Sequence, residues 1–244
     1  MTSARDRCRG GAWETVRELD PEFLEAYVRL AEVPERAGHL DPKVRAFVAL
    51  AIDANATHLH SDGIRSSLLE ARAVGASPAE ILEVLECAAT VSIHAMNVGV
   101  EVLLSVLEER GERTGPSPMT QYQRELKAEF TEQRGYWNPT WDQMLDVAPE
   151  MFDAYTAFSS HPWRTGHLTP LVKELIYIAF DTSVTHLYRV GLKLHIENAL
   201  GYGATPEQIL EVMEIAALIG VKSVVAGAPF LHEEAASGVT SAAS

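Results

Sequence analysis

An internal duplication limits the folds that this chain can adopt. Residues 41–75 and 169–203 align without a gap at an offset of 128 positions, and the same register extends over residues 21–99 and 149–227. Two copies are too few for a solenoid, in which three or more repeats stack to bury a continuous core. We therefore expect a pseudo-symmetric pair of repeats that share one core.

Helix starts are marked at matching places in the two copies. A residue that can cap a helix precedes a proline, which is favoured at the first helical position. These pairs are Asp20-Pro21, Asp41-Pro42, Ser77-Pro78, Thr169-Pro170 and Thr205-Pro206. Glu80 and Gln208 complete capping boxes three residues after two of the caps. No stretch alternates with the period of two that marks a half-buried strand, so the sequence predicts an all-α fold.

The polar segments between the apolar stretches suggest how the chain is divided. Each long stretch is expected to hold two helices, broken near residues 53–57 and 181–185. The predicted divisions are a first repeat at 12–110, a linker at 111–123, a second repeat at 124–234 and a disordered tail at 235–244.

The composition excludes several classes of protein. The 244 residues carry a net charge of −14, so no basic stripe is available to neutralise nucleic-acid phosphates. Cys8 and Cys87 are the only cysteines, which argues against a disulfide framework, a cysteine-rich zinc site or a dithiol centre. The N-terminus lacks the apolar core of a signal peptide, and we expect no membrane-spanning run. We expect a cytoplasmic protein with no nucleic-acid or membrane partner.

One face of the second copy combines ionisable residues with a glycine. If Thr185–Leu200 forms a helix, then Tyr188, Gly191 and His195 lie in one stripe, because residues three and four apart share a face. The equivalent residues of the first copy are His60, Gly63 and Ser67. Glycine within a helix costs about 1 kcal/mol relative to alanine, so its presence in both copies indicates close packing or a ligand-sized gap.

The order of motifs in the second copy is specific. A helix that carries Glu174 is followed by a polar break, by a helix in which His195 precedes Gly203 by eight residues, and by a capping box and an apolar helix. This order resembles that of the carboxymuconolactone decarboxylase/alkylhydroperoxidase D-like family. The resemblance implies an alkylhydroperoxidase D-like helical bundle with two pseudo-symmetric repeats. It also implies a homo-oligomer, with a trimer favoured.

The departures from the family's peroxidase branch exclude thiol chemistry. That branch carries C-x-x-C-x-x-x-H, and the thiol positions here hold Tyr188 and Gly191 ahead of His195. The decarboxylase branch lacks these cysteines and has a tryptophan ahead of the motif, which Trp163 matches. Glu174 matches the family's glutamate in type but lies two residues farther from the histidine.

The resemblance to the decarboxylase branch implies a cofactor-independent lyase for a small cyclic or unsaturated carboxylic acid, such as a lactone or an aromatic-derived acid. We expect His195 to act as the acid or base, assisted by Tyr188 or by Glu214 in an apolar helix. Arg189 is expected to hold the substrate carboxylate. The candidate substrate-binding residues are Trp163, Glu174, His186, Arg189, Gly191, His58 and His60.

Other interpretations remain open for these residues. A lone helical histidine is often a hydrogen-bonded core residue, and His58 and His186 also suit structural positions after the helix breaks. We expect no metal, because histidines two positions apart on a helix point in different directions and no carboxylate is evidently clustered with them. Glu83 and Glu211 are expected at the surface. The same pocket would also suit a hydrolase, isomerase or cyclase, or a non-catalytic small-molecule-binding protein.

Overall fold

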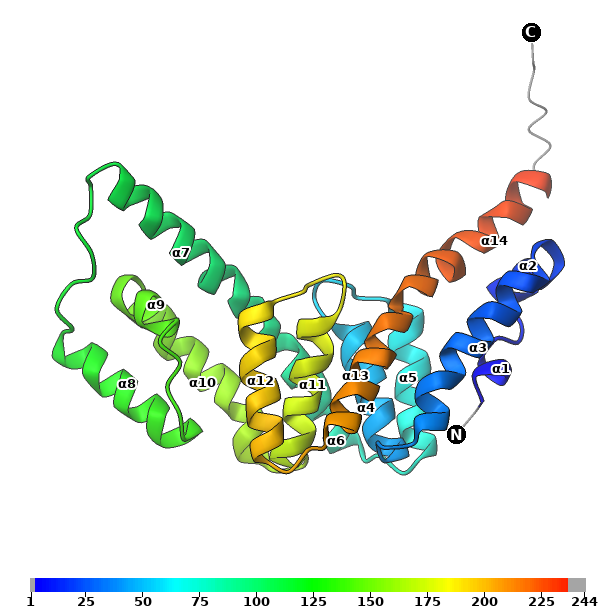
Figure 1. The fold of residues 1–244 in the computed structure, drawn as a ribbon, viewed down its shortest axis with the longest axis horizontal. Helices are drawn as coiled ribbons and strands as arrows, with labels where there is room; N and C mark the ends of the chain where they lie inside the picture. The colour runs from blue at the N-terminus through cyan, green and yellow to red at the C-terminus, as the bar shows by residue number, and fades with distance from the viewer. Residues whose placement is uncertain (1–2, 237–244) are drawn as a thin grey trace, which may run out of the picture.

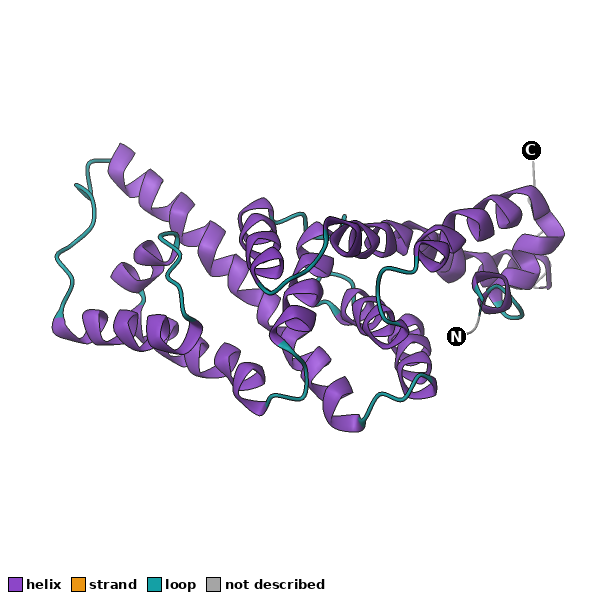
Figure 2. Ribbon diagram, turned by 60° about the horizontal axis from the view of Figure 1, so that its bottom comes forward, coloured by secondary structure: helices purple, strands orange, loops and turns teal. Residues whose placement is uncertain are grey.

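The computed structural model describes residues 3–236, and every regular element in that range is helical (Figure 1 and Figure 2). The first half contains α1 (Ala4–Arg7), α2 (Ala12–Leu19), α3 (Pro21–Ala37), α4 (Pro42–Ala54), α5 (Ser61–Ala73), α6 (Pro78–Ala89), the 3₁₀ turn η1 (Thr90–Ile93) and α7 (His94–Glu109). The second half contains α8 (Gln121–Arg134), α9 (Trp141–Val147), α10 (Pro149–Thr165), α11 (Pro170–Thr182), α12 (Arg189–Gly201), α13 (Pro206–Ala217), the 3₁₀ turn η2 (Leu218–Val221) and α14 (Lys222–Ala236). The all-α prediction is confirmed.

The helix starts follow the capping signals. All five predicted caps accept a hydrogen bond from a backbone N–H of the first turn, and both capping boxes form. Helix α8 already begins at Gln121, inside the segment predicted as a linker. Helix α14 continues to Ala236, and residues 237–244 of the predicted tail lie outside the described residues.

The breaks inside the long apolar stretches are turns with a strained residue. Helix α12 begins at Arg189, so the helix expected from Thr185 starts four residues later than predicted. Leu59 and Leu187 occupy equivalent positions in the two turns and have φ values of 45° and 49°. Residues other than glycine rarely adopt this left-handed backbone conformation, and the resulting strain persists only where the surrounding structure enforces it. The two turns therefore hold their histidines in a fixed direction.

The two repeats share a core centred on α4 and α11, which lie side by side in the middle of the molecule (Figure 1). One buried apolar cluster joins Phe47 of α4 with Ile176 and Phe180 of α11. A second cluster joins Val48 of α4 with Ile178 of α11. Because both faces of each central helix are covered, these helices are apolar on nearly every side.

The last helix of each repeat packs against the other repeat. Helix α7 contacts α9, and α14 contacts α2, so each arm in Figure 1 combines helices from both copies. His94 begins α7 and Lys222 begins α14, and these two residues occupy equivalent positions in the repeats. The exchange therefore brings the start of each last helix to the turn of the other repeat.

Two buried ion pairs join the repeats reciprocally. Glu83 on α6 pairs with Lys173 on α11 at 2.8 Å, and Glu211 on α13 pairs with Arg45 on α4 at 2.7 Å. Each carboxylate also accepts hydrogen bonds from two backbone N–H groups in the turn before its partner's helix. Both glutamates are 1% exposed, so the expectation that they lie at the surface was wrong. Their partners come from the other repeat, which sequence spacing within one repeat does not show.

The run from α6 to α7 has an exposed apolar side. Within the described residues, Pro78–Glu109 is one helical run that is long and apolar enough to cross a bilayer, and 28% of its most apolar window is buried. This is weak evidence for a membrane span, because core helices of soluble proteins meet the same criterion and α6 lies in the core. Helix α7, however, exposes Val98, Val102, Leu103 and Val106. The absence of a membrane partner stays a prediction.

We predict that breaking one buried pair destabilises the fold. Lys173→Met leaves the carboxylate of Glu83 buried without its cation and is expected to lower the free energy of unfolding by about 3–5 kcal/mol. The double variant Glu83→Leu/Lys173→Met should lose clearly less than the sum of the single losses in urea unfolding. Lys193→Met, which breaks an exposed pair with Glu197, serves as the control and should change stability by less than about 1 kcal/mol. Additive losses in the double variant would show that the two residues do not stabilise each other.

Candidate functional site

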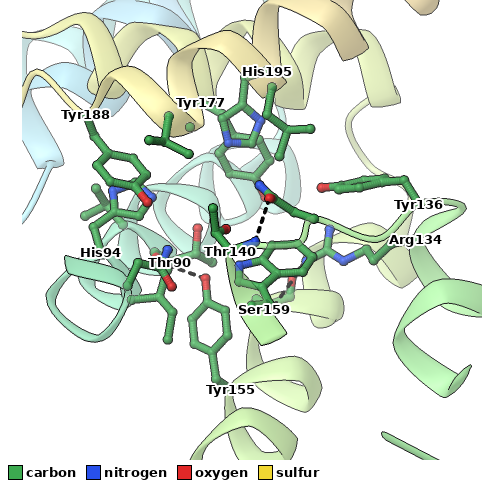
Figure 3. Close-up of a pocket in the computed structure, with 18 of the residues that line it drawn as sticks. Thr90, His94, Arg134, Tyr136, Thr140, Tyr155, Ser159, Tyr177, Tyr188 and His195 are labelled. Atoms are coloured by element: carbon green, nitrogen blue, oxygen red, sulfur yellow. Dashed lines mark hydrogen bonds between the residues drawn. The ribbon is translucent and has the colours of Figure 1, made fainter. Parts of the chain in front are cut away.

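A small cavity of about 70 Å³ lies where η1 and α7 of the first repeat meet α8, α10, α11 and α12 of the second (Figure 3). Its polar lining residues are Thr90, His94, Asn97, Arg134, Tyr136, Asn138, Thr140, Tyr155, Ser159, Tyr177, Tyr188 and His195. Three of the predicted site residues, Tyr188, Gly191 and His195, line this cavity. Tyr188 is the N-cap residue of α12, so it precedes the helix that was expected to carry it.

His195 is held by a buried carboxylate. Its Nδ1 lies 2.6 Å from Oε2 of Glu174 on α11, and the other oxygen of Glu174 accepts a hydrogen bond of 3.1 Å from Asn198. The Glu174 side chain is 1% exposed and does not itself line the cavity. Because an ionised carboxylate only accepts, His195 donates through Nδ1, which leaves Nε2 for a ligand. Glu174 is therefore a positioning residue and not a direct substrate contact.

Tyr177 forms the wall beside His195, and Trp163 supports it from behind. The two rings of Tyr177 and His195 have centroids 4.7 Å apart, and Trp163 Nε1 donates to the Tyr177 hydroxyl at 3.0 Å. Burial raises the pKa of Tyr177 well above its ordinary value, so the phenol stays neutral. Trp163 does not line the cavity. The structure thus places the predicted tryptophan behind a tyrosine, where it orients that ring.

The cation that faces the cavity is Arg134, at the end of α8, and not Arg189. Arg189 is exposed and lies over a separate outer hollow beside Lys193. Arg134 donates to the backbone oxygen of Ser159 at 2.9 Å, and its guanidinium lies 5.0 Å from the centre of the Trp163 ring. Its Nε is buried without a hydrogen-bond partner among the described residues. Arg134 therefore offers a fixed positive charge at the cavity.

A second group of titratable residues lies at the other end of the cavity. Asp181 ends α11 with its oxygens fully buried, and Oδ1 lies 3.6 Å from His186 Nε2 and 3.7 Å from His94 Nδ1. The two histidine nitrogens are 2.5 Å apart, and Tyr188 stacks on the His94 ring with centroids 3.8 Å apart. His186 thus contributes to this group behind His94 and does not line the cavity.

Burial sets the protonation states of this group. It raises the pKa of Asp181 to about 7, against the opposing charge of His195. It lowers the pKa of His94 to about 3, and the neighbouring His186 and His195 lower it further. Burial also lowers the pKa of His186. Both imidazoles are therefore neutral near pH 7, where neutral imidazole is a good metal ligand or proton acceptor.

The repeated glycine makes room for the repeated aspartate. A Cβ atom at Gly191 would lie 2.2 Å from Oδ2 of Asp181, and one at Gly63 would lie 2.5 Å from the carboxylate of Asp53. The gap expected between Tyr188 and the histidine is thus partly filled by a carboxylate from the preceding helix. Close packing, and not an empty hollow, explains why glycine is needed here in both repeats.

The first repeat forms a sister cluster around Asp53. His58 Nε2 lies 3.7 Å and His60 Nδ1 lies 4.0 Å from Asp53 Oδ1, and Lys222 Nζ lies 3.3 Å from the same oxygen. Ser67 donates to the other oxygen at 3.0 Å. Neither His58 nor His60 lines the cavity of His195, so the expectation that the first repeat lends them is wrong. The first repeat instead contributes His94.

The remaining predicted catalytic residue lies elsewhere. Glu214 is on α13, which packs against α3, α4 and α11, and it does not line the cavity. Its Oε2 is buried without a partner among the described residues. The apolar character of α13 did not indicate which neighbour Glu214 faces, because the several faces of this helix are buried against different helices. Cys87 is also buried near Tyr177, and burial raises its pKa to about 12, so this thiol is unreactive.

Sequence reasoning missed three residues that shape the site. Arg134 lies outside the repeated register, and no motif marks it. His94 reaches the cavity only through the exchange of last helices. Asp181 carried a usable signal, because Asp53 occupies the same position in the first repeat, but it was interpreted as a helix-breaking residue.

Comparisons with known proteins agree with this geometry. The family model of the carboxymuconolactone decarboxylase family matches residues 149–233. A crystal structure from Burkholderia xenovorans LB400, of a proposed gamma-carboxymuconolactone decarboxylase subunit, is 48% identical in sequence and superposes with a TM-score of 0.91. The match covers 95% of this chain and 94% of that one. No curated protein matches the chain. The chain belongs to the carboxymuconolactone decarboxylase family.

Proposed function

We propose that the chain is a decarboxylase-like lyase for a small unsaturated or cyclic carboxylic acid, with His195 as the proton donor. The observation that carries this proposal is the pair of His195 and buried Glu174, which faces a cavity that also holds the cation of Arg134. Such a pair fixes the tautomer and the direction of the imidazole, as proton transfer to a reacting atom requires. The name of the Burkholderia protein makes a carboxylated muconolactone the first substrate to test.

In the proposed reaction, Arg134 binds the substrate and His195 transfers a proton. Arg134 holds a substrate oxygen, and the aromatic walls exclude water from the reacting carbon. The bond between that carbon and the carboxylate breaks, carbon dioxide leaves, and the electron pair passes into the conjugated carbonyl of the substrate. The proton comes from the imidazolium form of His195, in which Nδ1–H stays bonded to Glu174 and the carboxylate offsets the positive charge. Nε2 gives its proton to the carbon, and solvent reprotonates Nε2. Fixed donors at the cavity stabilise the enolate charge that develops in between.

We predict that His195→Ala lowers kcat/KM for carbon dioxide release by about 10²–10⁴, the usual contribution of a positioned acid or base. Glu174→Gln keeps an acceptor for Nδ1 but removes the charge, so it should lower kcat with little change in KM. His161→Ala, an exposed histidine on α10, is the matched control and should leave turnover unchanged. Full turnover by His195→Ala would contradict the assignment of His195 as the proton donor. Conversion of the acid without carbon dioxide release would favour an isomerase or hydrolase.

Arg134 should act mainly on substrate binding. Because a charge-assisted hydrogen bond contributes about 1.5–3 kcal/mol, Arg134→Met is expected to raise KM by about ten- to 100-fold. Arg189→Met removes an exposed cation from the same repeat and should leave KM unchanged. The reverse result, in which Arg189→Met raises KM, would restore the prediction made from the sequence.

We propose in addition that the exposed apolar side of α7 is an interface with a second copy of the chain. Val102 and Leu103 are 58% and 52% exposed on a helix that reaches away from the core (Figure 1). Exposed apolar patches of this kind commonly mark protein–protein interfaces. The Burkholderia relative is named as a subunit, which supports an assembly. We favour a homo-oligomer, with a trimer as the expectation from the family.

A single charge introduced on α7 tests the proposed assembly. Val102→Asp is expected to shift the protein to a smaller species in light scattering coupled to size exclusion, because a carboxylate would be buried in the interface. Leu82→Asp is the control, since Leu82 lies on the same helical run and is 56% exposed. A monomeric wild-type protein, or an equal shift in the control, would contradict an interface on α7.

A further inference from the structure

Three potential ligand atoms lie close together beside the cavity. Nδ1 of His94, Nε2 of His186 and Oδ1 of Asp181 are separated by 2.5, 3.6 and 3.7 Å. The point equidistant from all three lies about 1.9 Å from each, close to the 2.0–2.2 Å typical of zinc bound to nitrogen and oxygen. An ion there would replace the hydrogen bond between the two imidazoles and move their nitrogens apart. Two neutral imidazoles and one carboxylate form a common set of protein ligands for a divalent transition metal.

The carboxylate has no other partner. Asp181 is 0% exposed, and neither of its oxygens receives a hydrogen bond from any residue in the described range. A buried carboxylate without a hydrogen bond or counter-charge is costly, and native structures almost always satisfy one. Glycine at position 191 and the strained turn at Leu187 both serve to place Asp181 and His186 where they are. The surroundings thus hold a carboxyl group without a hydrogen bond at the meeting point of two imidazoles.

The sister cluster supplies an internal comparison. There Oδ2 of Asp53 accepts a hydrogen bond from Ser67, and Oδ1, which has no hydrogen bond, lies 3.3 Å from the ammonium of Lys222. At the equivalent positions the second cluster has His94, contributed by the first repeat, and His195, which is already held by Glu174. The second cluster therefore has an imidazole where the first has an ammonium, and it retains the aspartate. A bound cation would restore the charge balance that Lys222 provides in the first repeat.

We propose that His94, Asp181 and His186 bind one divalent transition-metal ion, of which Zn²⁺ is the best match in size and ligand preference. This site departs from the expectation of no metal, which rested on histidines two positions apart and did not include His94. His94 lines the cavity, whereas Asp181 and His186 lie behind it, so an open position on the ion would have to face the cavity beside the His94 ring. Catalytic zinc sites characteristically combine three protein ligands with one open position. If the proposed decarboxylation holds, the open position suits an oxygen of the same carboxylic acid.

The test measures metal binding without substrate, so its failure is distinguishable from a failure of the proposed function. The full-length protein is freed of metal with a chelator and titrated with Zn²⁺ against a chromophoric competitor, and Co²⁺ absorption reports the coordination. We expect one equivalent per chain, and binding weaker by more than about 100-fold in His94→Lys and Asp181→Asn. His94→Lys copies the arrangement of the sister cluster, so this variant is expected to fold, which circular dichroism checks.

His58→Ala is the matched control, because it removes the equivalent of His186 from the cluster that already contains Lys222. It should retain one equivalent with unchanged affinity. Absence of Zn²⁺ and Co²⁺ binding in the wild type, undiminished binding in His94→Lys, or loss of binding in His58→Ala would each overturn the proposal. If the wild-type protein binds neither ion, the three residues would be a hydrogen-bonded group with a protonated aspartate.

Discussion

The structure depends on carboxylates and cations that satisfy one another across the boundary between the repeats. Glu83 and Glu211 lie in the core, and each is neutralised by a cation and by backbone N–H groups of the other repeat. Either repeat alone would leave its glutamate and its cation buried without partners, at a cost of several kcal/mol per ion. The two copies are therefore parts of one unit, and the exchange of α7 and α14 follows the same reciprocal arrangement.

That exchange also explains how two similar sites acquired different chemistry. Each site takes its aspartate, its turn and its glycine from one repeat and the first residue of the last helix from the other. In the first repeat the contributed residue is Lys222, which closes an ion pair with Asp53. In the second repeat it is His94, which leaves Asp181 unpaired beside a cavity. The two clusters thus differ at three equivalent positions, which hold His60, Ser67 and Lys222 at the first site and Tyr188, His195 and His94 at the second.

The second site combines three kinds of group in and beside one small cavity. The pair of His195 and Glu174 supplies an oriented acid or base, and Arg134 supplies a fixed cation. The group around Asp181 lies at the other end, where burial shifts the pKa values of all three of its members. Perturbed titratable groups that gather at a cavity are characteristic of functional sites. At the two positions that match the thiols of the family's peroxidase motif, Tyr188 stacks on His94 and Gly191 admits the aspartate.

The sequence alone determined the helical class, the repeat, the helix starts and the family, because caps, prolines and motif spacing act within a few residues of one another. It also singled out His195, which lines the cavity. It also placed Tyr188 and Gly191 at the site. The tertiary structure decided which charges meet. The arginine that lines the cavity is Arg134 and not the predicted Arg189, because helix α8 lies across the cavity. Glu214 does not line the cavity. Contacts between residues of different repeats, such as His94 with Asp181, depend on how helices cross in space, and no local pattern in the chain records that geometry.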